Sequence, residues 1–86
     1  MIRTALLAAS LVLASFQAMA DDRLCRGGIT AEDAMRIARD AGVGQIQKVE
    51  CDDGRWEVEG RDPQDRKIEV KIHAGDGRVL TVERNG

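Results

Sequence analysis

Apolar residues recur with two different periods along this chain. From Ile29 to Ala41 they follow steps of three and four, which is typical of a helix with one buried face. Thr30 can cap this helix and Asp33, three residues on, can return the hydrogen bond. Glycine is common just after the end of a helix, and Gly42 occupies that position here. The pattern therefore predicts one helix over this segment. The apolar stripe of the helix consists of Ala31, Ala34, Met35, Ile37, Ala38 and Ala41.

The remainder of the chain alternates with period two, which predicts strands. The Asp52-Asp53-Gly54 and Gly75-Asp76-Gly77 segments are tight-turn signals, and a longer loop surrounds Pro63. We therefore expect an α+β fold in which one N-terminal helix packs on a three- to four-stranded antiparallel sheet. The strands are expected at 47–51, 55–59, 67–73 and 78–83.

The first twenty residues predict export. A short basic start is followed by an apolar run over 4–16, and Ala18-Met19-Ala20 supplies small residues before Asp21. This is the layout of a signal peptide cleaved after Ala20, with an uncleaved anchor as the alternative. The expected organisation is a signal peptide at 1–20, an N-terminal arm at 21–28 and a domain at 29–86. The processed protein would then be periplasmic or secreted, without a membrane span.

Two cysteines, Cys25 and Cys51, lie in the exported part of this 86-residue chain. So short a chain buries little surface and usually needs a covalent link. An internal disulfide would close a loop of 26 residues, worth about 3.5 kcal/mol in the chain-entropy account. An intermolecular bridge and two free thiols are the alternatives.

Few reactive groups are available for catalysis after residue 20. Serine and tyrosine are absent from 21–86, and the only hydroxyls are Thr30 and Thr81. A Ser–His–Asp arrangement is therefore impossible, and a Cys–His pair would need a thiol that the disulfide removes. We expect a protein that is not an enzyme and has no cofactor.

His73 is the one histidine of the chain. With Asp52, Asp53 or Asp76 it could bind a metal, and this defines the alternative function, a small-ligand or metal-binding periplasmic protein. No cysteine or histidine pair has zinc spacing, and the ligand run of a calcium loop is missing. An exposed histidine beside a turn is the simpler interpretation, and no metal site is expected.

The charged strand residues Glu57, Glu59, Glu69, Lys67 and Lys71 fall on outward positions, where a solvated, salt-bridged face is expected rather than acid–base catalysis.

Nucleic-acid binding fits poorly with a formal net charge of −2 and 2% aromatic residues. Trp56 is expected to anchor the core, or alternatively to serve as a partly exposed contact residue.

Residues 30–82 resemble a PepSY domain. The similarity consists of the order and spacing of a helix with spaced alanines, an acidic-Gly turn, an aromatic-x-Val strand, a third strand and a final small-residue turn before Val-Leu. Where the family commonly has Asp after the third strand, this chain has His73, so no role of that Asp is transferred. The matching segments are Thr30-Ala31-Glu32-Asp33-Ala34, Ile37-Ala38, Gly42, Val49-Glu50, Asp53-Gly54, Trp56-Glu57-Val58, Ile68-Glu69-Val70 and Gly77-Arg78-Val79-Leu80.

The resemblance implies a non-catalytic exported module that binds another envelope or secreted protein, and it suggests inhibition or regulation of a peptidase. Strand addition at an open sheet edge is a mechanism that such a fold allows. The last strand, 79–83, is the expected edge. The candidate interaction residues are Trp56, Val79, Thr81 and Glu83, beside the disulfide residues Cys25 and Cys51.

Overall fold

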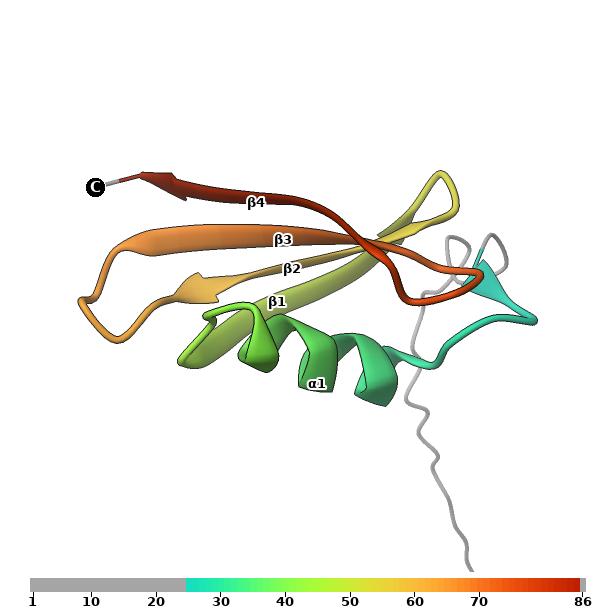
Figure 1. Ribbon diagram of the computed structural model, residues 1–86, viewed down its shortest axis with the longest axis horizontal. Helices are drawn as coiled ribbons and strands as arrows, with labels where there is room; N and C mark the ends of the chain where they lie inside the picture. Colours follow the sequence, from blue (N-terminus) through green and yellow to red (C-terminus); the bar gives the residue numbers. More distant parts are fainter. Residues whose placement is uncertain (1–24, 86) are drawn as a thin grey trace, which may run out of the picture.

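The computed structural model describes residues 25–85, and Figure 1 shows one helix lying across one face of a twisted antiparallel sheet. The strands follow one another in the order β1-β2-β3-β4, so β1 and β4 form the two edges. The elements are α1 (Ala31–Asp40), β1 (Gln45–Asp52), β2 (Arg55–Arg61), β3 (Lys67–His73) and β4 (Val79–Asn85).

Helix α1 begins at Ala31 because Thr30 and Asp33 form a capping box. Asp33 N donates to Thr30 Oγ1 at 3.0 Å, and Thr30 N donates to Asp33 Oδ2 at 3.1 Å. The helix faces the sheet with Ala34 and Ala38, both fully buried. These small side chains let the helix approach β1, β2 and β3 closely.

The core lies between α1 and the two central strands. Alternate residues of β2 and β3 point toward the helix and are buried, as the period of two requires. Val58, Ile68, Val70 and Ile72 are completely enclosed. This cluster holds the helix against the sheet and leaves the opposite sheet face to the charged residues.

The β1–β2 hairpin turns through Asp53 and Gly54, which both have positive φ. That is the backbone of a two-residue type I′ turn, for which Asp-Gly is a preferred pair. The turn fixes the register of Cys51 opposite Trp56, so the disulfide residue and the tryptophan lie side by side.

The longer β2–β3 loop is organised by Asp62, the one buried charged residue among those described. Its Oδ1 accepts hydrogen bonds from the backbone amides of Gln64 and Arg66 at 2.9 Å each, and its Oδ2 accepts from Arg66 Nε at 2.8 Å. Burial alone would raise the pKa of Asp62, but the amide and guanidinium of Arg66 outweigh it, so this pKa is lowered.

The α+β composition and the antiparallel sheet agree with the sequence, but the expectation of an N-terminal helix is wrong. The described chain starts at Cys25, turns through 26–28 and runs extended through Ile29 before α1 begins. The reason lies in the tertiary contacts of this segment. The disulfide ties Cys25 to β1, and Ile29 N donates to Ala74 O at 2.8 Å, so the chain crosses the end of the sheet before it can turn into a helix.

Candidate protein-interaction site

Strand β4 is an edge strand that the helix leaves uncovered. In Figure 1, α1 lies over the side of the sheet that contains β1, and β4 lies farthest from it. Every residue of β4 is exposed, including the apolar Val79, Leu80 and Val82, which retain 41%, 39% and 38% of their accessible surface. An edge strand with exposed apolar side chains and an unpaired row of backbone groups is the part of a sheet that accepts another strand.

A bulge in β4 changes the sheet face on which Val79 lies. The register shifts between Lys71 and Ile72 of β3, so Val79 pairs with Ile72 while Thr81 pairs with Lys71. Paired residues share a face, which places Val79 on the helix side and Thr81 on the opposite, outer side.

The helix-side face of the sheet has a continuous row of four valines. Val49, Val58, Val70 and Val82 are direct partners across β1, β2, β3 and β4, and we call them the valine row. Val58 and Val70 are fully buried, whereas Val82 at the β4 end is exposed. The apolar surface of the core therefore continues to the open edge.

The outer face has a row of like charges. Glu59, Glu69 and Glu83 are direct partners across β2, β3 and β4, and we call them the glutamate row. Lys48 of β1 pairs with Glu59 and completes the row at that edge, with its Nζ 3.3 Å from Glu50 Oε2. At the β4 edge the row ends on Glu83, which lies directly opposite Glu69 and diagonal to Lys67 and Lys71 of β3. Like charges directly opposite one another are destabilising.

Glu57 lies on the outer face of β2, beside the glutamate row. Its partial burial and the neighbouring carboxylates Glu69 and Asp52 raise the pKa of Glu57, although Lys71 and Arg55 act in the opposite direction. Arg55 Nη2 lies 3.5 Å from Glu57 Oε2, a contact too long to compensate fully. At Glu57, burial and the two neighbouring carboxylates thus outweigh the two cations.

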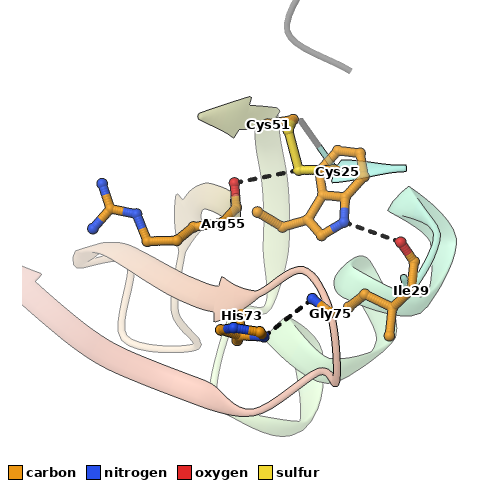
Figure 2. The surroundings of a disulfide bond; sticks show 7 residues. Cys25, Ile29, Cys51, Arg55, His73 and Gly75 are labelled. Carbon is orange, nitrogen blue, oxygen red and sulfur yellow. Dashed lines mark hydrogen bonds between the residues drawn. A yellow bond between two sulfur atoms is a disulfide. The ribbon is translucent and has the colours of Figure 1, made fainter. Parts of the chain in front are cut away.

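The segment before α1 is fixed to the sheet by the disulfide. Figure 2 shows the bond between Cys25 and Cys51, with Cys25 Sγ 3.7 Å from the carbonyl oxygen of Arg55. The internal pairing expected from the sequence is confirmed, with the two Cα atoms 6.1 Å apart. Trp56 Nε1 donates to Ile29 O at 3.2 Å, and Trp56 is 7% exposed. Trp56 is therefore buried in the core.

His73 stabilises the β3–β4 turn. Its Nδ1 accepts from the amides of Gly75 at 3.1 Å and Asp76 at 3.3 Å, and Figure 2 shows the first of these bonds. Asp76 Oδ1 lies 3.2 Å from the same nitrogen and would pair with it only if the ring were protonated. Between Cys25 and Asn85, no group of three or more His, Cys, Asp or Glu side chains is placed to hold a metal ion.

A shallow hollow of about 360 Å³ lies beside the disulfide, between the segment before α1 and Trp56. Its polar side chains are those of Arg26 and Thr30. Thr30 is already engaged with Asp33 as the helix cap, so the hollow offers little specific chemistry to a small ligand. For the alternative of a small-ligand or metal-binding protein, residues 25–85 thus provide this hollow and no assembled group of metal ligands.

Of the four candidate interaction residues, the structure brings Thr81 and Glu83 together on the outer face of β4 and puts Val79 on the helix side. Leu80 and Val82 were not among the residues expected to interact, although both are exposed. The alternation of 79–83 was the available signal, but it gave no sign of the bulge or of how far the helix extends over the sheet.

The signal peptide predicted at 1–20 and most of the arm predicted at 21–28 lie outside the described residues. Over 25–85, the single helix has only ten residues, and nothing there could span a bilayer as a helix.

A disulfide-linked α+β module with one helix on a four-stranded sheet is thus the class of protein that the fold defines. The family model described as "Peptidase propeptide and YPEB domain" matches residues 4–83, and the chain belongs to this PepSY family. The match begins within the segment interpreted as a signal peptide. No curated protein and no solved structure gave a significant match.

Proposed function

We propose that this protein is a non-catalytic exported module that binds another envelope or secreted protein, and that a peptidase is the partner it restrains. Membership of a family described by peptidase propeptides supports a peptidase-related role. The N-terminal pattern of 1–20 supports export and cleavage after Ala20.

The observation that carries the proposal is the open edge of β4. Among the described residues, β4 pairs with β3 on one side and with no strand on the other; its apolar side chains are exposed, and the helix leaves it uncovered. An extended segment of a partner can add there as a fifth strand, with main-chain hydrogen bonds giving affinity and side chains giving specificity.

The experiment is affinity capture from envelope extract with the purified protein as bait. The Val82→Lys variant places a charge on the exposed end of the valine row and should abolish specific capture. Glu32→Lys on α1 is the matched control, because Glu32 is exposed and far from β4 in sequence and fold. A captured protein, identified by mass spectrometry and purified, should bind the wild type and the control directly.

Direct inhibition is then measured with that purified partner. Loss of peptidase activity in the presence of the wild type, but not of Val82→Lys, is the expected result. Equal capture by all three baits would contradict binding at β4, and turnover of any substrate by the protein alone would contradict a non-catalytic role.

A further inference from the structure

The two rows of side chains that end on β4 define the chemistry of the strand that would add there. The inference rests on the proposed function and specifies its partner. Adjacent residues Val82 and Glu83 end the valine row and the glutamate row, on opposite faces of the same edge. A fifth strand would continue both rows with two adjacent residues of its own.

The helix-side position requires an apolar residue. Val82 continues a row whose inner members, Val58 and Val70, are fully buried. A partner side chain opposite Val82 would cover its exposed surface and extend the core. A polar residue there would leave this surface in contact with water or be desolvated itself.

The outer position favours a cation over a carboxylate. At the β1 edge the chain itself places Lys48 next to Glu59, whereas the β4 edge ends on Glu83. A carboxylate opposite Glu83 would lengthen a row of three like charges, and a lysine or arginine would complete it as Lys48 does at the other end.

A second copy of this chain does not supply that cation. The outer face of β4 consists of Thr81, Glu83 and Asn85, whereas Arg84 pairs with the buried Ile68 on the helix side. Arg84 is also engaged there, with its Nε 3.4 Å from Asp62 Oδ2. Antiparallel pairing of two β4 strands would therefore bring no basic side chain next to Glu83.

We propose that the β4 edge recognises an extended segment of a partner protein in which apolar residues alternate with lysine or arginine. The apolar side chains lie on the helix side beside Val82, and a basic side chain lies on the outer side beside Glu83. Backbone hydrogen bonds to β4 hold the segment, and the basic residue selects it.

The test uses three labelled seven-residue peptides and fluorescence anisotropy at low ionic strength. In the acetylated and amidated peptides, valine alternates with lysine, glutamate or threonine. The lysine peptide should bind about tenfold more tightly than the glutamate peptide, with threonine between them. Added salt should narrow this preference because it screens the exposed charges.

The variants Glu83→Gln and Glu83→Lys locate the selectivity. The first should reduce the preference for the lysine peptide, and the second should reverse it. Glu32→Lys changes the net charge equally on the helix and should leave the preference intact. Circular dichroism of each variant confirms that the fold is retained.

N-methylation separates strand addition from unspecific charge attraction. Two versions of the lysine peptide are methylated on alternate amides, so that each blocks one edge of the peptide strand. If the peptide pairs with β4 along one edge, one version should bind and the other should not. Equal binding of both versions, or a lysine preference that survives Glu83→Lys, would overturn the proposal.

Two further outcomes separate this inference from the proposed function. If all three peptides bind equally and N-methylation still matters, strand addition stands and the charge selectivity is refuted. If none binds, strand addition at β4 is refuted along with the selectivity. Sedimentation that shows a dimer dissociated by Val82→Lys would assign the edge to a second copy and refute the proposal.

Discussion

At the residue scale, the side chain of Asp62 accepts more hydrogen bonds within the loop between β2 and β3 than any other described side chain. One carboxylate satisfies two backbone amides and the Nε of Arg66, and it also lies near Arg84 of β4. The loop has no hydrophobic residue of its own at its centre, so its conformation depends on this buried acid.

Replacement of Asp62 by alanine should destabilise the protein by about 1–3 kcal/mol, because two loop amides lose their acceptor. Thermal unfolding followed by circular dichroism should show a lower Tm, whereas Gln64→Ala in the same loop should have little effect. Asp62→Asn keeps one acceptor oxygen, so its Tm should lie between those of Asp62→Ala and Gln64→Ala. An unchanged Tm for Asp62→Ala would mean that the loop is held by other contacts.

The lowered pKa of Asp62 also predicts a dependence of stability on pH. Its folded pKa lies below the ordinary value of 3.8, so its contribution is present above 3.8 and is lost as the pH falls through the folded value. Asp33 and Asp76 have lowered pKa values too, mainly through hydrogen bonds with the backbone amides of Thr30 and Arg78, and act in the same direction. Asp62→Asn should therefore show a shallower loss of Tm in acid than the wild type.

The raised pKa of Glu57 predicts the opposite dependence of stability on pH. Burial, Glu69 and Asp52 raise its folded pKa above the ordinary value of 4.5, so its ionised form disfavours folding at neutral pH, and this penalty disappears as the pH falls through the folded value. Glu57→Gln should raise the Tm at pH 7 by about 2 °C and have no such effect below pH 4.5. The measurement in acid is the internal control, and a lower Tm at pH 7 would contradict the account.

At the element scale, the close contact between β2 and the chain entering β1 depends on Gly60. A Cβ at this position would overlap the carbonyl oxygen of Gln45 and lie 2.9 Å from Val43 Cγ1. The absent side chain thus allows Val43 to enter the core beneath α1.

Gly60→Ala should consequently destabilise the protein by about 1–3 kcal/mol or more, since a backbone atom must move. Gly44→Ala is the matched control, because a Cβ there meets nothing nearer than Arg61 O at 3.4 Å. Chemical denaturation of both variants measures the difference. Equal stabilities would show that β1 and β2 can separate at this point without cost.

At the scale of the whole molecule, the disulfide connects the first described residue to the edge strand farthest from β4. It joins Cys25 to Cys51 across 26 residues and encloses the whole of α1. In a domain this small, such a link constrains the unfolded chain over a large part of its length.

The double variant Cys25→Ala/Cys51→Ala should lose about 3.5 kcal/mol of stability. For a domain of this size, that corresponds to a fall in Tm of roughly 15–25 °C. Reduction of the wild-type protein, which removes the bond and leaves both side chains in place, should reproduce most of the loss. Coincident melting of the oxidised and reduced proteins would exclude a stabilising role for the disulfide.

The sequence by itself determined the local elements. The 3.6-residue period of 31–40, the capping pair Thr30 and Asp33, and the Asp53-Gly54 turn act over a few residues, so they can be recognised without a fold. An internal pairing of the two cysteines could be expected because the sequence holds no others. The sequence did not show that the segment before Thr30 crosses the end of the sheet, because this follows from the contacts of Ile29 with Ala74 and Trp56.

Only the tertiary structure decided which side chains are available for binding. Trp56 and Val82 look alike in an alternating pattern, yet one is enclosed by the segment before α1 and the other is left open. This difference arises because one ten-residue helix is too narrow to cover four strands. The bulge at Leu80 is a second tertiary feature, and it places Val79 on the helix side of the sheet. Long-range packing sets both features, and no local pattern encodes them.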